Sequence, residues 1–186
     1  MIGRPGTVGG PAGGTRREAI KEMQRSEGAS LVAAFGTTTG ETRTASADIA
    51  IFTAATSQLI DITDQVAVIV AEADIEAGLA LISSPHTTCA VIVNEAEPGF
   101  IRDFARALER LAPEDAHYDH DAAPHDADYE QPNGYAHIRS AFLSSPSVML
   151  PIRDGMLALG RWQRIFFVEL DHARPRTCQV TLLGRG

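Results

Sequence analysis

The chain has 186 residues and an apolar fraction of 44%, which is enough for one globular domain with its own core. Its net charge of -8 argues against a nucleic-acid-binding protein and against a polybasic membrane surface. No apolar run approaches the roughly 20 residues that a membrane helix needs, and the start of the chain lacks the apolar core of a secretion signal.

The first quarter of the chain differs in composition from the rest. Glycine recurs through residues 3–14, and the only apolar run that follows is the short segment 31–35. Such a composition favours a flexible Gly-rich extension over residues 1–45. We therefore predict a single folded domain over residues 46–186.

Strands are predicted where β-branched and aromatic residues gather, over 48–55, 58–62, 165–170 and 177–183. Within residues 79–95, two further apolar strands flank the polar turn 84–88.

Three helices are predicted between these strands. Asp61 or Thr63 can cap the first, which carries Val66, Ile69 and Val70 on one face. The second runs from Pro98 to Pro113, and its apolar stripe is predicted to be core. That stripe consists of Ile101, Phe104, Ala105, Leu108, Leu111 and Ala112. A short third helix is predicted over residues 134–143.

The pair Asp154-Gly155 lies between apolar runs in residues 147–159 and indicates a hairpin, because both residue types tolerate positive φ. Strands therefore lead and close the chain, with helices between them and no regular βαβ alternation. This order predicts an α+β fold with much antiparallel pairing.

Residues 114–133 are rich in Asp and His without apolar periodicity, so they are predicted to be a long loop. His117 and His120 are three residues apart, but nothing in the sequence makes this stretch helical. No standard zinc spacing is present, so composition alone favours a solvated acidic surface over a metal site. Cys89 and Cys178 lie in separate apolar strands and are predicted to be buried reduced thiols, as in a cytoplasmic protein.

Several polar residues have both a structural and a functional interpretation. His86 can satisfy carbonyl groups at strand ends or act in a site, and alone the structural role is favoured. Glu95 can interact with the start of the following helix. The residue types and their spacing therefore lead to an α+β domain with a possible His/carboxylate site.

Four ordered motifs add a resemblance. They are His86-Thr87-Thr88-Cys89-Ala90 with Asn94-Glu95, Tyr118 with His120-Asp121, Asn133 through Ala136-His137-Ile138, and Gly160-Arg161-Trp162-Gln163 with Glu169-Leu170-Asp171. Together they resemble the YjbQ-type family, whose members are often labelled secondary thiamine-phosphate synthases. The similarity covers roughly residues 46 to 184. Arg161 stands where the family commonly has Thr.

The resemblance implies a compact α+β fold of mixed, largely antiparallel sheets in a sandwich or barrel-like arrangement with two or three helices. It also implies a homotrimer and a divalent metal ion, either zinc or magnesium or manganese. The implied metal ligands are His86, His120 and His137. The implied catalytic residues are His86, Glu95, Asp121 and Gln163. The implied substrate-binding residues are Thr87, Thr88, Asn133, Arg139 and Arg161.

The function that follows from the resemblance is a transferase. It joins a pyrimidine methyl diphosphate to a thiazole phosphate and releases pyrophosphate, and its partner is a small-molecule substrate. The alternatives are a metal-dependent hydrolase, a small-molecule-binding trimer of another substrate, and a structural trimer with histidines at its interface. Convergence of the three histidines in an open cleft near Glu95 favours an enzyme, whereas buried histidines bonded to backbone favour the structural trimer.

Overall fold

The structure, a computed structural model, describes residues 40–122, 131–143 and 146–186. Residues 1–39 of the predicted extension lie outside the described residues. The elements in chain order are β1 (Thr42–Phe52), β2 (Gln58–Asp61), α2 (Thr63–Glu72), β3 (Ala77–Ser83), β4 (Cys89–Glu95), α3 (Pro98–Leu111), α4 (Asp119–Ala122), α5 (Gly134–Leu143), β5 (Ser147–Arg153), β6 (Met156–Leu157), β7 (Gln163–Glu169) and β8 (Pro175–Arg185).

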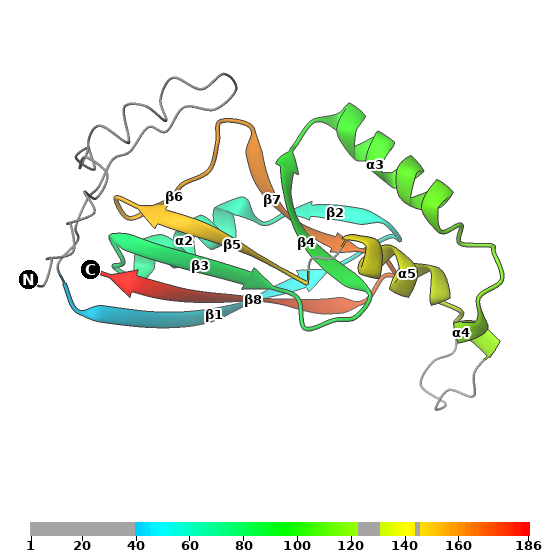
Figure 1. The fold of residues 1–186 in the computed structure, drawn as a ribbon, viewed down its shortest axis with the longest axis horizontal. Helices are drawn as coiled ribbons and strands as arrows, with labels where there is room; N and C mark the ends of the chain where they lie inside the picture. The colour runs from blue at the N-terminus through cyan, green and yellow to red at the C-terminus, as the bar shows by residue number, and fades with distance from the viewer. Residues whose placement is uncertain (1–39, 123–130, 144–145) are drawn as a thin grey trace, which may run out of the picture. The chain divides into compact units, whose positions relative to one another are not determined.

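The strands form two sheets, and every pair of neighbouring strands is antiparallel (Figure 1). One sheet has the order β1-β8-β3-β5-β6 and the other the order β2-β7-β4. The predicted α+β class with largely antiparallel sheets is confirmed. No helix in the described ranges is long and apolar enough to cross a bilayer.

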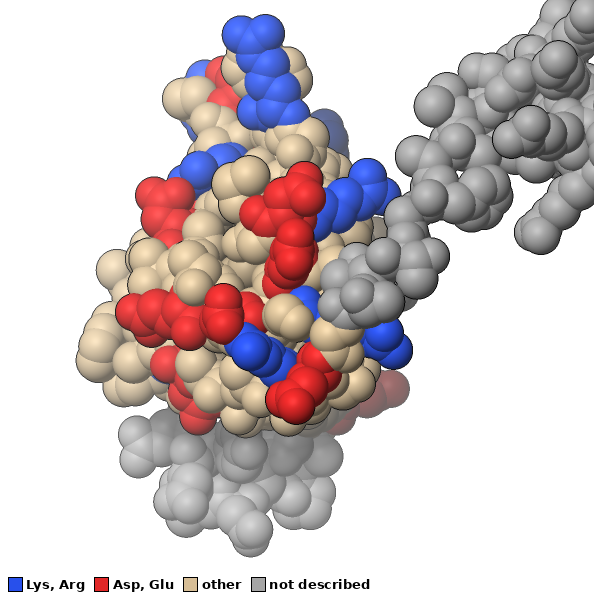
Figure 2. Space-filling view, turned by 90° about the vertical axis from the view of Figure 1, so that its left-hand side faces the viewer, with Lys and Arg blue, Asp and Glu red and all other residues tan. Residues whose placement is uncertain are grey.

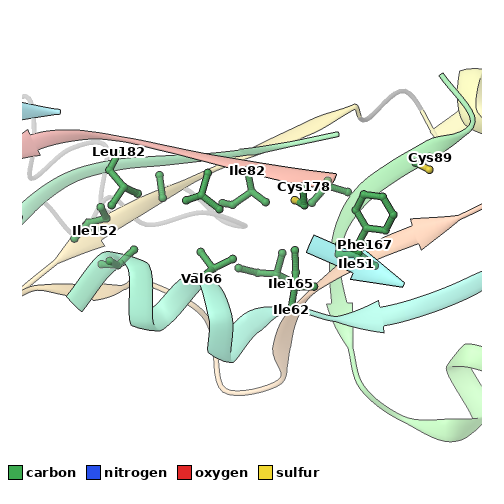
Figure 3. Close-up of a cluster of buried hydrophobic side chains, with 14 of the residues drawn as sticks. Ile51, Ile62, Val66, Ile82, Cys89, Ile152, Ile165, Phe167, Cys178 and Leu182 are labelled. Carbon is green, nitrogen blue, oxygen red and sulfur yellow. The ribbon is translucent and has the colours of Figure 1, made fainter. Parts of the chain in front are cut away.

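The main core lies between the five-stranded sheet, helix α2 and the inner face of β4 and β7. Strand β8 turns Cys178, Val180 and Leu182 inward because side chains alternate along a strand. Helix α2 contributes Val66 and Val70 to the same cluster (Figure 3). This sandwich of sheets around a helix holds the ends of β4, β7 and β8 in place.

A second core lies on the other face of the three-stranded sheet. Phe166 and Val168 of β7 pack there with Tyr135 and Ala136 of α5 and Leu108 of α3. This contact docks the start of α5 beside the end of β7.

The apolar stripe of α3 is only partly core, which corrects the prediction. Leu108 is the buried residue of this helix, whereas Phe104 and Ile101 are half-buried and Leu111 is 45% exposed. The helix begins beyond the end of β4 (Figure 1), and Phe104 and Leu108 pack on the second core. Among the described residues, Ile101, Ala105 and Leu111 belong to neither core cluster.

Strand β1 begins at Thr42, six residues before the predicted strand. Thr42 to Ala47 are small or polar residues, yet each pairs with β8 between Val180 and Arg185. Cross-strand pairing therefore extends the strand where residue preference did not predict it.

The hairpin at Asp154-Gly155 is confirmed. It joins β5 to β6, and both turn residues have positive φ, 51° and 72°. The prediction that Cys89 and Cys178 are buried free thiols is also confirmed.

Strands β3 and β4 belong to different sheets. The polar segment 84–88 is therefore a crossing between the two sheets and not a reversal within one. Ser84 anchors it, since its N–H donates to Pro146 O at 2.7 Å and its hydroxyl accepts from the N–H of His86 at 3.3 Å. The crossing carries His86, Thr87 and Thr88 to the junction of the sheets and α5.

Candidate functional site

A pocket of about 250 Å³ lies where this crossing meets the start of α5 and the β7–β8 connection. Its lining consists of Pro85, His86, Thr87, Thr88, Asn133, His137, Asp171, Arg174 and Arg176. The structure thus brings together five predicted site residues from two motifs that are about 45 positions apart in the chain.

The imidazole of His86 is held by a backbone donor. The N–H of Thr177 donates to His86 Nε2 at 3.0 Å, so the proton of the neutral ring lies on Nδ1. Burial, together with the nearby guanidinium of Arg176, lowers the pKa of His86 below its ordinary value of 6.5. His86 is therefore neutral at pH 7 and presents an N–H donor from its other nitrogen.

Asp121 caps helix α5 from a distance. Its Oδ1 accepts hydrogen bonds from the backbone N–H groups of Asn133 and Gly134, at 3.0 and 2.8 Å. Asp121 belongs to α4, one helical turn inside the segment predicted to be a loop, so that prediction is wrong for residues 119–122. This turn also places the ring of His120 4.4 Å from that of His137.

We expect Asp121→Ala to destabilise the protein by about 1 kcal/mol, because two N–H groups at the start of α5 lose their acceptor. Chemical denaturation measures the loss. Asp119→Ala is the matched control, since Asp119 is an exposed carboxylate in the same turn. Equal losses in the two variants would contradict the capping role.

The metal ion implied by the resemblance does not fit the three histidines as they stand. In the described ranges, no group of three or more His, Cys, Asp or Glu side chains lies close enough to hold a metal ion. His86 has a further obstacle. Coordination through Nε2 uses the lone pair that Thr177 N–H occupies, and coordination through Nδ1 puts a proton on Nε2 opposite that N–H. Either mode breaks the bond to Thr177.

Three predicted residues lie at the opposite end of the three-stranded sheet. Glu95 pairs with Gln163 at the far ends of β4 and β7, and the exposed Arg161 guanidinium stacks on Trp162. Gln163 Oε1 accepts from Gly160 N–H at 2.8 Å. The seven residues from Cys89 to Glu95 span roughly 20 Å, so these side chains do not reach the His86 pocket of their own chain.

Arg139 is inside the protein and does not line the pocket. Its guanidinium donates to Ala112 O and Ser57 Oγ, each at 2.9 Å, and pairs with Glu109. The side chain also lies over the ring of Tyr135. These contacts join α5 to the end of α3 and to the β1–β2 connection.

The pocket also contains two arginines that were not predicted as site residues. Arg176 pairs with the fully buried Glu169, and Arg174 pairs with Asp171 at 3.0 Å. Glu169 and Asp171 are the acidic residues of the Glu-Leu-Asp motif. The sequence signal was the segment Arg174-Pro175-Arg176, which begins three residues after that motif and places two arginines two positions apart, on the same side of extended chain.

A second pocket, of about 370 Å³, lies where the end of α2 meets the β5–β6 hairpin. Asp74, Glu76 and Asp154 line it, and Arg43 pairs with Asp74. Figure 2 shows acidic side chains gathered on this side of the described structure. The second pocket contains none of the predicted site residues, so the smaller pocket beside His86 is the candidate site.

Comparison with known proteins assigns the family. The family model described as UPF0047 protein YjbQ-like matches residues 47–185. A UPF0047 protein of Archaeoglobus fulgidus is 40% identical over 136 residues, which cover 73% of this chain and 99% of the relative. The UPF0047 protein YugU of Bacillus subtilis is 34% identical and covers 68% of this chain and 90% of its own.

Solved structures agree with these sequence matches. A YbjQ-like protein from Sulfolobus solfataricus superimposes with a TM-score of 0.70 at 34% identity, covering 78% of this chain and 100% of its own. A YjbQ/UPF0047 protein from Clostridium acetobutylicum gives a TM-score of 0.64 at 32% identity, with 73% and 98% covered. The chain belongs to the YjbQ-like UPF0047 family.

Proposed function

We propose that the His86 pocket binds a phosphorylated small molecule, and that the protein is a transferase of the secondary thiamine-phosphate synthase type. The observation that carries the proposal is the convergence of two guanidinium groups and two threonine hydroxyls around a neutral imidazole. Guanidinium and hydroxyl groups are common donors to phosphate oxygens.

The reaction separates pyrophosphate from a pyrimidine methyl group and joins the carbon to the nitrogen of a thiazole phosphate. Negative charge grows on the leaving pyrophosphate, so donors already fixed in place stabilise that step. Asp171 fixes Arg174 and Glu169 fixes Arg176. His86 can donate its Nδ1–H to a phosphate or ring acceptor, since Thr177 sets its tautomer.

A hydrolase of a single phosphorylated substrate is the second candidate. The pocket volume of about 250 Å³ lies below the usual range for ligand sites, roughly 300–1,000 Å³. It suits one phosphorylated ring more readily than two substrates side by side. A neutral imidazole in the same pocket can assist water as well as a leaving group.

A divalent ion and a homotrimer stay predictions of the resemblance. The rings of His120 and His137 lie 4.4 Å apart, and His86 can join them as a ligand only by releasing Thr177. The half-buried apolar side of α3 supports a trimer, because a second copy can cover it. If Glu95 and Gln163 act at this pocket, they come from another copy, since in their own chain they lie at the far ends of β4 and β7. The buried free thiols of Cys89 and Cys178 support a reducing compartment such as the cytoplasm.

The test is formation of thiamine phosphate and pyrophosphate by the purified protein from the two phosphorylated precursors, with metal content and oligomer mass measured on the same sample. We expect Thr87→Val to lower kcat/KM by about tenfold, because one hydrogen bond to a charged group is lost. Thr181→Val is the matched control, as Thr181 is exposed on β8 away from the pocket.

Two outcomes separate the candidates. Release of phosphate from a single monoester without thiamine phosphate formation would replace the transferase by the hydrolase. If neither thiamine phosphate nor free phosphate forms, with or without added metal, both enzymatic proposals are wrong.

A further inference from the structure

Arg176 is held by an unusually complete set of contacts for an arginine that lines a pocket. Nε donates to Glu169 Oε2 and Nη2 donates to Glu169 Oε1, both at 2.7 Å. Nη2 also donates to Thr88 Oγ1 at 3.1 Å. The side chain is 6% exposed, and that of Glu169 is 0% exposed.

Glu169 is in turn fixed from several sides. Its carboxylate accepts from Thr53 Oγ1 at 3.1 Å and from the N–H of Asp171 at 3.0 Å. The buried ion pair is therefore a rigid support that aims the guanidinium of Arg176. A charged group positioned in this way loses little conformational entropy when a ligand binds.

One edge of the guanidinium is left for a ligand. Among the described residues, no hydrogen bond involves Arg176 Nη1. Tyr135 Oη is the only fully buried side-chain polar atom without a partner in this part of the chain, so Nη1 does not belong to that class. Nη1 is therefore not fully buried, and Arg176 lines the pocket, so the pocket is where a ligand can reach this nitrogen.

A second carboxylate holds a second arginine of the pocket. Asp171 accepts a hydrogen bond from Asn133 Nδ2 at 2.9 Å and forms an ion pair with Arg174 Nη2 at 3.0 Å. Within the described ranges, Arg174 Nε and Nη1 have no partner. Asn133 is 6% exposed, and its Oδ1 is an acceptor with no donor recorded among the same residues. Two guanidinium edges and one amide acceptor thus open into the same pocket.

We propose that Arg176 Nη1 and Arg174 form a subsite for one oxyanion group of a small ligand, with Asn133 Oδ1 accepting a hydrogen bond from a donor beside that group. The two carboxylates balance the two guanidinium charges, so the subsite suits one phosphate or carboxylate group and takes a diphosphate through one of its phosphates. The inference rests on the proposed function only in taking the same pocket as the ligand site.

Binding, not turnover, is the test. We would titrate the full chain by calorimetry with inorganic phosphate, phenyl phosphate, benzoate and pyrophosphate, at low and high salt. We expect saturable binding of phenyl phosphate or benzoate, at least as tight as that of pyrophosphate. The better of these two ligands identifies the oxyanion as phosphate or carboxylate.

Two variants test the residues. Arg176→Lys keeps a cation for Glu169 but removes the guanidinium edge with Nη1 that faces the ligand. We expect binding of the better probe to be about tenfold to a hundredfold weaker. Arg174→Gln, at a side chain that is 39% exposed, is the variant least able to disturb the fold and should weaken binding at least severalfold. Arg153→Gln removes the same charge from an exposed position on β5 and should change nothing.

The inference fails if folded Arg176→Lys and Arg174→Gln, checked by circular dichroism, bind like the parent, or if Arg153→Gln weakens binding equally. It also fails if none of the four probes saturates the parent protein. Binding that follows this pattern without any turnover keeps the subsite and rejects the proposed reaction. Turnover that is unchanged in both pocket variants keeps the reaction and rejects the subsite.

Discussion

Glu169→Gln is expected to lower the free energy of unfolding by about 3–5 kcal/mol, the usual cost of removing one partner from a buried ion pair. The substitution leaves the guanidinium of Arg176 inside the protein without its counter-charge. It also weakens the acceptor for Thr53 Oγ1 and for the N–H of Asp171. Urea denaturation at constant pH measures the change.

Glu72→Gln is the matched control for this prediction. Glu72 is exposed on α2, so the same chemical change there should cost less than about 0.5 kcal/mol. The double variant Glu169→Leu with Arg176→Met should be more stable than Glu169→Gln alone, because no buried charge remains. A loss below about 1 kcal/mol in Glu169→Gln would show that Arg176 reaches solvent and that the pair is not buried as described.

His86 is expected to make the protein acid-sensitive. Burial and Arg176 lower the pKa of the imidazole in the folded state, so the unfolded chain takes up this proton at a higher pH. Between the ordinary value near 6.5 and the lower folded value, the unfolded state binds more protons. The stability contributed by neutral His86 is therefore fully present above about pH 6.5 and is lost as the pH falls through the folded pKa.

Two substitutions separate the roles of this imidazole. His86→Leu removes the acceptor of the Thr177 N–H and should cost about 1–3 kcal/mol at pH 7.5. His86→Gln can keep an amide oxygen opposite that N–H but cannot titrate, so its stability should fall less than the parent's between pH 7.5 and 5. Chemical denaturation across this range gives both numbers. A parent and His86→Gln with the same pH slope would exclude His86 as the titrating group.

Local sequence patterns predicted the elements whose partners are set by short-range chemistry. The Asp154-Gly155 turn and helix α5 are such elements. Positive φ and helical spacing act over a few residues, so the sequence alone is sufficient there. The start of β1 was missed because its pairing with β8 joins residues more than 130 positions apart.

The candidate site divides in the same way. His86, Thr87 and Thr88 are neighbours in one segment, and the resemblance added Asn133 and His137, which the structure places in the same pocket. The resemblance also predicted Glu95, Gln163, Arg161 and Arg139 as site residues, but the structure puts the first three at the far end of the three-stranded sheet and Arg139 in the interior.

By itself the sequence determined the local elements, the buried thiols and the polar character of the segment 84–88. Only the tertiary structure decided that this segment crosses between two sheets and that Arg174 and Arg176 lie beside it. It also decided that Glu169 is the buried counter-charge of Arg176. These outcomes depend on which strands pair and which sheet faces pack, and that choice is made by contacts between residues distant in the chain.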